Sequence, residues 1–247
     1  GQKVDAKRVI SSVNRCLNPY EKEDYEKMME VAASDDLEII VSNTTEAGIQ
    51  YDPSCKQDDC PPSSFPAKLT QVLYHRYKAG KKGIIMLACE LIDNNGKELL
   101  KCVNQYIEQW GLEDGFKKYV NEDCTFCGSL VDRIVPGFPR KEIAQIQKKI
   151  CYADNLVVQA EIFHLWVIEA AENLSLRQLA EEFPANKAGL NVLFVKSEAP
   201  YHERKVTLLN GPHTVLSPVA YLSGVNIVRD ACNHPVIGKY VRKVQFD

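Results

Sequence analysis

Apolar residues recur along this chain with two different periods, and the period indicates which segments are strands and which are helices. Short, continuous apolar runs bounded by turn residues are typical of buried strands. Such runs occupy residues 37–42, 83–89, 126–135 and 190–195. Apolar residues near helical spacing predict helices over 25–33, 65–77, 97–109 and 141–150. Residues 157–169 fit either a strand or a helix.

Polar turns and one loop separate these elements. The first predicted strand ends in the polar turn 43–48, and Asn94-Asn95-Gly96 forms a predicted turn before the third helix. Residues 52–64 contain prolines, cysteines and several acids, and are expected to be a loop. Ser63 or Ser64 is expected to cap the helix that follows.

The order of these elements predicts an α/β fold. Strand, helix, strand and helix in succession are typical of a parallel sheet with helical crossovers. After Glu198 the pattern becomes helical and the strand signals fade. We therefore place a domain boundary near residue 196, with one domain over 1–195 and a second over 196–247.

The composition is that of an ordinary soluble globular protein. Apolar residues make up 45% and charged residues 26% of the chain, the net charge is -3 and the pI is about 6.0. These values give no indication of a nucleic-acid partner or of an anionic membrane partner. No run of 18 apolar residues occurs, and residues 1–5 lack the order of a signal peptide. We therefore expect a cytoplasmic protein.

Nine cysteines, an odd number, are scattered along the chain and are expected to be free thiols. Cys124 and Cys127 form a C-x-x-C pair, but structural zinc requires a second such pair or a close pair of histidines. No metal site is therefore expected. A small metal-binding protein that uses these two cysteines and a histidine stays an alternative.

Three groups of residues could carry chemistry. On an ideal helix Lys205 and Asn210 point about 140° apart with His213 between them, so a base, an amide and an imidazole could converge. The alternative is a surface lysine, a cap and a partly buried histidine, and Pro212 could kink or restart the helix. The turn 43–48 follows a strand, where α/β sheets bind ligands, or is a plain turn. Asp132 lies within an apolar strand, where a buried charge is costly unless it is used, or on an edge strand.

These residues resemble those of the polyol-specific long-chain dehydrogenases, the family of mannitol dehydrogenase and the uronate reductases. The K-x4-N-x2-H signature of the family matches Lys205, Asn210 and His213. An asparagine after a central strand is similar to Asn95, and the Val-Asp-Arg-Ile strand of the family matches residues 131–134. Residues 42–49, 89–93 and 130–137 are most similar to uronate reductases, in particular those acting on tagaturonate.

The resemblance implies metal-independent hydride transfer with NAD between tagaturonate and altronate. The implied partner is a small-molecule substrate of the hexuronate or aldonate class, and no sequence pattern predicts the oligomeric state. Lys205 would be the general acid-base group, Asn95 and Asn210 would donate hydrogen bonds to the reacting oxygen, and His213 would orient the substrate. Asp132 would bind a substrate hydroxyl. The residues expected beside the nicotinamide are Asn43, Thr44, Thr45 and Glu46.

The implied fold is the later part of a Rossmann-like nucleotide-binding domain followed by the start of an all-α substrate domain. The family's glycine-rich phosphate loop and its later helices have no counterpart in this sequence, so we expect a fragment. Two further readings stay open. One is fructuronate reductase or a mannitol-type dehydrogenase, and the other is a non-catalytic fragment with no working cofactor site.

Overall fold

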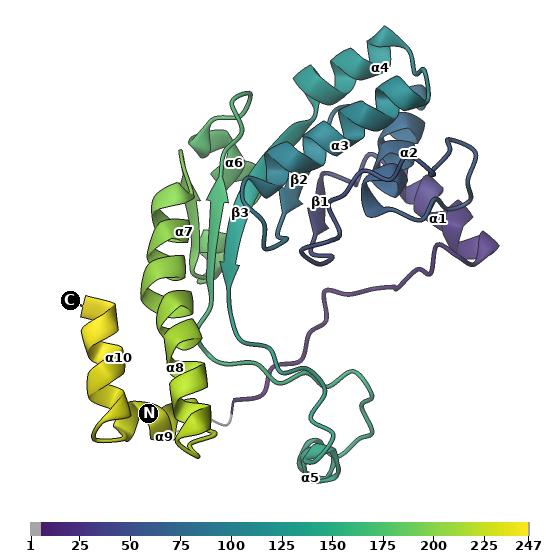
Figure 1. Cartoon of the computed structure of the whole chain (residues 1–247). Helices are drawn as coiled ribbons and strands as arrows, with labels where there is room; N and C mark the ends of the chain where they lie inside the picture. Colours follow the sequence, from purple (N-terminus) through teal and green to yellow (C-terminus); the bar gives the residue numbers. More distant parts are fainter. Residues whose placement is uncertain (1–5, 247) are drawn as a thin grey trace. The chain divides into compact units, whose positions relative to one another are not determined.

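The computed structural model describes residues 6–246, which divide into two compact units (Figure 1). The first unit extends to Lys196 and the second begins at Ser197. Residues 1–5, on which the signal-peptide expectation depends, lie outside the described residues. Each unit has a hydrophobic core of its own.

The first unit is built on a five-stranded sheet whose spatial order follows the chain. The strands are β1 (Ile39–Ser42), β2 (Ile85–Ala88), β3 (Thr125–Asp132), β4 (Leu165–Glu169) and β5 (Val192–Val195). β1, β2 and β3 are mutually parallel, β4 runs antiparallel to β3, and β5 is parallel to β4.

The parallel arrangement expected from the alternation of strands and helices is confirmed for β1, β2 and β3, and β4 departs from it. Residues 133–164, which join β3 to β4, leave the sheet and return to it at the same end. Gly137 and Gln159 form an antiparallel bridge within this excursion, so its two arms run side by side. A parallel neighbour would require a crossover to the opposite end of the sheet, usually through a packed helix.

Helices cover both faces of the sheet. The helices of the first unit are α1 (Lys22–Ala32), α2 (Phe65–Lys78), α3 (Asn95–Gln109), α4 (Asp114–Lys118), α5 (Ile143–Ile150) and α6 (Leu176–Glu182). A π-helical turn, η1 (Tyr119–Asp123), and a 3₁₀ turn, η2 (Ala185–Ala188), complete it. The strands and helices predicted from periodicity are confirmed to within a few residues, with two exceptions. β3 ends at Asp132, and only the last five residues of 157–169 form a strand.

The starts of α2 and α3 are each fixed by a single residue near the first turn. Ser64 caps α2, because its Oγ accepts the N–H of Ala67 at 3.2 Å, and this confirms one of the two predicted caps. The predicted turn at 94–96 is wrong beyond Asn94, since α3 begins at Asn95. A side chain at Gly96 would overlap the backbone of Cys127, so glycine lets the first turn of α3 pack directly against β3.

Alternation along the strands builds two cores on the two faces of the sheet. Met86 packs with α2 and α3 on one face, and the adjacent Leu87 packs with Leu179 of α6 on the other. Figure 1 shows α2 and α3 together on one side of the strands. Each fully buried aliphatic side chain contributes about 1.5–3 kcal/mol to the free energy of folding. A sheet covered on both faces explains why its strands read as unbroken apolar runs.

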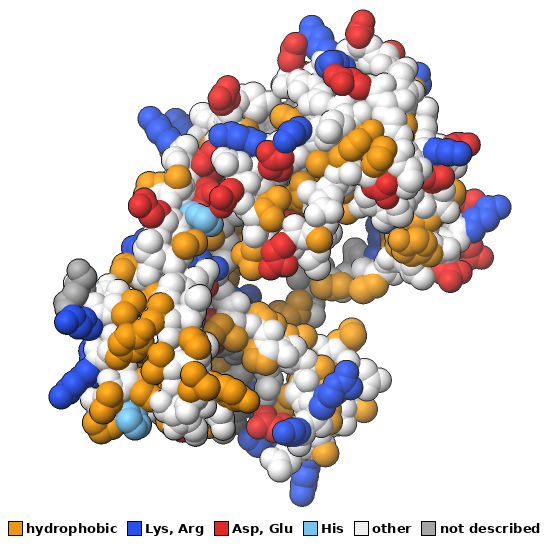
Figure 2. Space-filling model, in the orientation of Figure 1, with side chains coloured by type: hydrophobic (Ala, Val, Ile, Leu, Met, Phe, Trp, Pro, Cys, Tyr) orange, Lys and Arg blue, Asp and Glu red, His pale blue; other side chains and the backbone are white. Residues whose placement is uncertain are grey.

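The second unit is all helical. Its elements are α7 (Ala199–Lys205), a π-helical turn η3 (Val206–Asn210), α8 (Gly211–Leu222), α9 (Val228–Asn233) and α10 (Ile237–Phe246). Leu216, Ala231 and Val241 lie in its small core. Hydrophobic side chains also gather on its surface (Figure 2), among them Tyr221, Leu222 and Val236. No helix within residues 6–246 has the length and apolar character needed to cross a bilayer.

Arg76 connects three elements of the first unit. Its side chain is buried, with 3% exposed. Nη1 donates to the carbonyl oxygens of Ala32 at 2.9 Å and Ser34 at 2.8 Å, and Nε donates to that of Lys82 at 2.9 Å. The guanidinium therefore ties the end of α1 and the segment before β2 to α2, and it satisfies three carbonyl oxygens of the backbone.

Replacing Arg76 by methionine is expected to lower the free energy of unfolding by about 3 kcal/mol, because three carbonyl oxygens lose a charged donor. The loss is measured by urea unfolding followed by circular dichroism. The control is Arg177→Met, which removes an exposed ion pair with Glu181 and should cost less than about 1 kcal/mol. Equal losses in the two variants would contradict the structural role of Arg76.

Candidate active site

The carboxyl ends of three parallel strands meet at one edge of the sheet. Residues 43–46 follow β1, Asn95 lies shortly after β2, and Asp132 ends β3. Because β1, β2 and β3 are parallel, these positions share an edge even though they are far apart in sequence. Ligands of open α/β sheets bind at this edge. The first unit thus holds one set of the predicted site residues.

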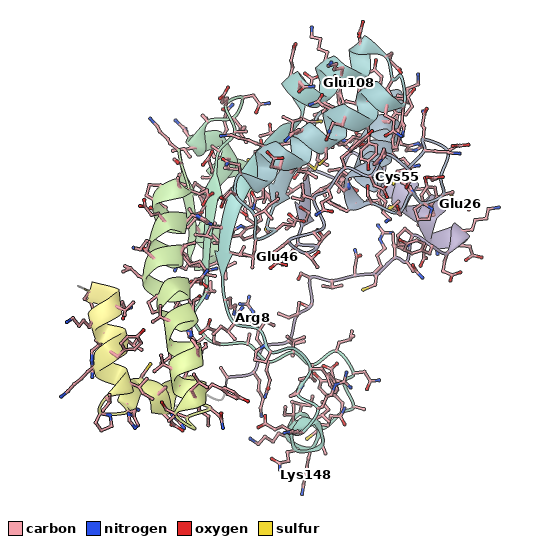
Figure 3. The ribbon with its side chains drawn as sticks, in the orientation of Figure 1. Arg8, Glu26, Glu46, Cys55, Glu108 and Lys148 are labelled. Carbon is pink, nitrogen blue, oxygen red and sulfur yellow. The ribbon has the colours of Figure 1, made fainter. Side chains whose placement is uncertain are left out.

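The turn after β1 is exposed along its length. Asn43, Thr44, Thr45 and Glu46 are all exposed, and Figure 3 labels Glu46 in this turn. Thr44 also directs its N–H and its hydroxyl to the carboxylate of Glu90, at 3.1 and 3.0 Å. The side chains of Asn43, Thr45 and Glu46 are therefore open to a ligand, while the hydroxyl of Thr44 anchors the turn.

Glycine closes this turn. The N–H of Gly48 donates to the carbonyl oxygen of Thr45 at 2.9 Å. A Cβ on Gly48 would overlap the hydroxyl of Thr44, the same hydroxyl that donates to Glu90. A side chain at position 48 would therefore displace Thr44 from its buried partner.

Glu90 is a buried residue of this edge that the sequence analysis missed. It is 2% exposed and accepts three hydrogen bonds, from Thr44 twice and from the hydroxyl of Ser42 at 2.9 Å. A carboxylate accepts but does not donate, and these three donors offset much of the cost of its burial. Its place directly after an apolar run is visible in the sequence, but its donors lie 46 and 48 residues earlier in the chain.

The amide of Asn95, which the resemblance assigned to the reacting oxygen, is occupied by protein groups. In this structure its Nδ2 donates to the carbonyl oxygens of Glu90 at 2.9 Å and Ser129 at 2.8 Å. Its Oδ1 accepts from the N–H groups of Gly96 at 2.8 Å and Ser129 at 3.0 Å. A primary amide has two N–H donors and two lone pairs, and all four are used. No N–H is left for a substrate oxygen, so Asn95 holds α3 and β3 together instead.

Thiol chemistry is disfavoured at this edge. Cys89 is buried beside Ser129, and burial raises the pKa of its thiol to about 11. Burial also raises the pKa of Cys124 to about 11 and that of Cys127. A raised pKa disfavours the thiolate, which is the nucleophilic form of cysteine. Cys124 and Cys127 also pack into different cores, so the C-x-x-C pair does not form one metal site.

A hollow of about 580 Å³ lies beside the turn after β1. Its volume is within the range of small-molecule sites, roughly 300–1,000 Å³. Its lining mixes hydroxyl, amide, charged and aromatic side chains. The lining residues are Ala47, Gly48, Gln50, Tyr51, Asp52, Pro53, Ser63, Ser64, Phe65 and Lys68.

Asp132 lies farther along the same edge. It faces Leu165 across the antiparallel pair of β3 and β4 and is partly buried. It is three positions after Ser129, so it lies about 10 Å beyond the Asn95 network along the strand. The next residue, Arg133, donates to the carbonyl oxygen of Glu161 at 2.9 and 3.0 Å.

The second unit carries the other predicted set on one long helical segment. α7, η3 and α8 follow one another without a break, with Val206 and Gly211 in helical conformation. Within η3 the N–H of Gly211 donates to the carbonyl oxygen of Val206, five residues back. Pro212 comes directly after this wider turn, so the helix continues through the proline rather than restarting there.

The π turn changes which residues share a face. An ideal α-helix would place Lys205 and Asn210 about 140° apart. In a π turn, residues five apart lie one above the other, so Lys205 and Asn210 follow the same face. His213 comes three residues after Asn210 and shares that face. Lys205 is partly buried, and Asn210 and His213 are exposed.

The two units match two domains of one family. Residues 1–179 match the mannitol dehydrogenase Rossmann domain, and residues 198–247 match the mannitol dehydrogenase C-terminal domain. Among curated relatives, an altronate oxidoreductase of Phocaeicola vulgatus is 60% identical over 251 residues, covering 100% of this chain and 51% of that protein. An altronate oxidoreductase of Bacillus subtilis is 43% identical with the same coverage. The chain thus spans about half the length of the curated relatives it matches.

Solved structures share the fold. A substrate-free D-sorbitol dehydrogenase superposes with a TM-score of 0.72 at 22% identity, covering 90% of this chain and 46% of that one. A ternary complex of Pseudomonas fluorescens mannitol 2-dehydrogenase with NAD and D-mannitol gives a TM-score of 0.68 at 22% identity, with the same coverage. The sheet, the helical second unit and both matched domains lead to one conclusion. The chain belongs to the mannitol dehydrogenase family.

Proposed function

We propose that this chain is the central part of an NAD-dependent oxidoreductase that interconverts tagaturonate and altronate. Residues 1–195 would belong to the nucleotide-binding domain, and residues 196–247 would begin the helical substrate domain. Relatives named altronate oxidoreductase at 43–60% identity over the whole chain support the substrate pair. The observation that carries the chemistry is the π turn, which puts Lys205 and Asn210 on one face of a helix.

The carboxyl edge of the sheet fits the proposed cofactor. The turn after β1 offers exposed amide, hydroxyl and carboxylate groups at Asn43, Thr45 and Glu46, and its backbone is fixed from beneath by Glu90. We assign these three residues to the nicotinamide end of NAD. When bound, NAD supplies the hydride acceptor or donor of the reaction, and the protein supplies position and electrostatics.

Lys205 moves the proton in the proposed reaction. In the oxidation direction its neutral amine takes the proton of the reacting hydroxyl, as the C–H bond of the same carbon gives up its hydride and a ketone forms. In reduction the ammonium group returns the proton to the oxygen. Asn210 donates a hydrogen bond to that oxygen as negative charge develops on it. His213 orients the substrate, and Asp132 accepts a hydrogen bond from another substrate hydroxyl.

Asn95 has a different part in this proposal from the one its sequence position indicated. Its amide is saturated by Glu90, Gly96 and Ser129, so it fixes the backbone of the edge rather than contacting the substrate. Asn95 and Asn210 were both predicted to donate a hydrogen bond to the reacting oxygen, and in this proposal only Asn210 does so. The proposed stabilisation of the oxygen therefore comes from the second unit, where Lys205 also lies.

The complete gene product that contains this chain is expected to consume NADH when mixed with tagaturonate. Absorbance of NADH is followed with tagaturonate, fructuronate and fructose in parallel. Tagaturonate should give the highest kcat/KM. A preference for fructuronate or fructose would reassign the protein to a sister activity, and no loss of NADH with any of the three would contradict the proposal.

A Lys205→Ala variant of that protein is expected to lose activity by a factor on the order of 10²–10⁴ in kcat, because general acid-base catalysis contributes about that much. The matched control is Lys243→Ala, which removes an exposed lysine from α10 of the same unit. The control should keep the turnover of the wild type. Near-normal turnover in the Lys205 variant would show that another group moves the proton.

A further inference from the structure

Glu90 makes contacts with both of its polar ends, and each end reaches a different strand. Its side-chain carboxylate accepts from Ser42 and Thr44 after β1. Its main-chain carbonyl oxygen accepts from Nδ2 of Asn95. The same Nδ2 donates to the carbonyl oxygen of Ser129 in β3, and Oδ1 of Asn95 accepts the N–H of Ser129. One residue therefore links the carboxyl ends of β1, β2 and β3.

The turn and the carboxylate constrain one another. If residues 42–44 moved away, a carboxylate that is 2% exposed would lose all three donors named above, which is unfavourable inside a protein. Gly48 adds a second constraint, because the backbone there approaches the Thr44 hydroxyl so closely that a side chain would displace it. The conformation of the turn thus depends on its hydrogen bonds to Glu90 and on the absence of a side chain at position 48.

We propose that Glu90 is a positioning residue for cofactor binding, which fixes the Ser42–Thr44 turn so that Asn43, Thr45 and Glu46 face the nicotinamide. This inference rests on the proposed function. Glu90 itself touches no ligand in this account, because its carboxylate lies beneath the turn and is occupied by protein donors. Its effect passes through the conformation of the turn alone.

The test uses Glu90→Gln and Ser42→Ala in the complete gene product. Glutamine keeps the size of the side chain but replaces one accepting oxygen with an NH₂ group, so at least one of the three donors loses its partner. Alanine at position 42 removes a single donor. The matched control is Thr70→Val, which also removes one buried hydroxyl bond, to the carbonyl oxygen of Pro66 in α2 at 2.7 Å.

Two measurements separate positioning from general stability. The first is the Kd for NADH, measured by fluorescence titration without turnover. The second is hydrogen exchange of the peptide that covers residues 42–48, measured by mass spectrometry. Glu90→Gln is expected to raise the Kd about ten-fold and to speed exchange in this peptide. Ser42→Ala should do both to a smaller extent, and Thr70→Val should do neither.

The outcomes distinguish this inference from the proposed function. A Glu90→Gln protein with the NADH affinity and the exchange rate of the Thr70→Val control would overturn the positioning role, even if the wild type reduces tagaturonate. A wild type that binds NADH but reduces none of the ketones would contradict the proposed substrate. In that case the NADH affinities of the variants would still decide the role of Glu90.

Discussion

The buried carboxylate of Glu90 is the interaction on which the arrangement of the sheet edge depends. A charged group with so little access to water is stable only where donors surround it, and here the donors come from the turn after β1. The same residue receives the amide of Asn95, whose other contacts reach β3. The polar edge is therefore one hydrogen-bonded network, and the apolar cores below it set the spacing of the strands that carry it.

In the second unit, the π turn determines which residues of the long helical segment share a face. Two polar residues five apart do not share a face of an α-helix, and the π turn at η3 removes this mismatch. Pro212, which has no N–H to donate, follows the π turn directly and fits a helix whose bonding is already widened there. A local irregularity thus brings Lys205 and Asn210 toward one face of the helix, as the proposed reaction requires. π-helical turns are frequent at functional sites.

Much of the fold could be predicted from local pattern. The unbroken apolar run before Glu90 predicts β2, and Ser64 predicts the start of α2, because both signals lie within a few residues of the feature they specify. The direction of β4 could not be predicted, since it depends on how residues 133–164 return to the sheet. The π turn was missed because helical periodicity assumes a constant rise and rotation.

The residues of the candidate site also differ in whether local sequence identifies them. The signature at Lys205, Asn210 and His213 is local, and its residues were identified from spacing and resemblance. Asn95 was assigned a catalytic role from its resemblance to an asparagine of the family. Its partner Ser129 is 34 residues away, so no local pattern shows that the amide is already occupied. Glu90 was overlooked for the related reason that its donors lie 46 and 48 residues earlier in the chain.

The most direct test of the account is a crystal structure of the complete gene product with NAD and altronate. The account predicts that Nζ of Lys205 and Nδ2 of Asn210 both lie within hydrogen-bond distance, about 2.7–3.2 Å, of the same altronate oxygen. It also predicts that the nicotinamide contacts the turn at Asn43–Glu46, while the Asn95 amide keeps its bonds to Ser129. A substrate oxygen bound by Asn95 instead, or a nicotinamide far from that turn, would contradict it.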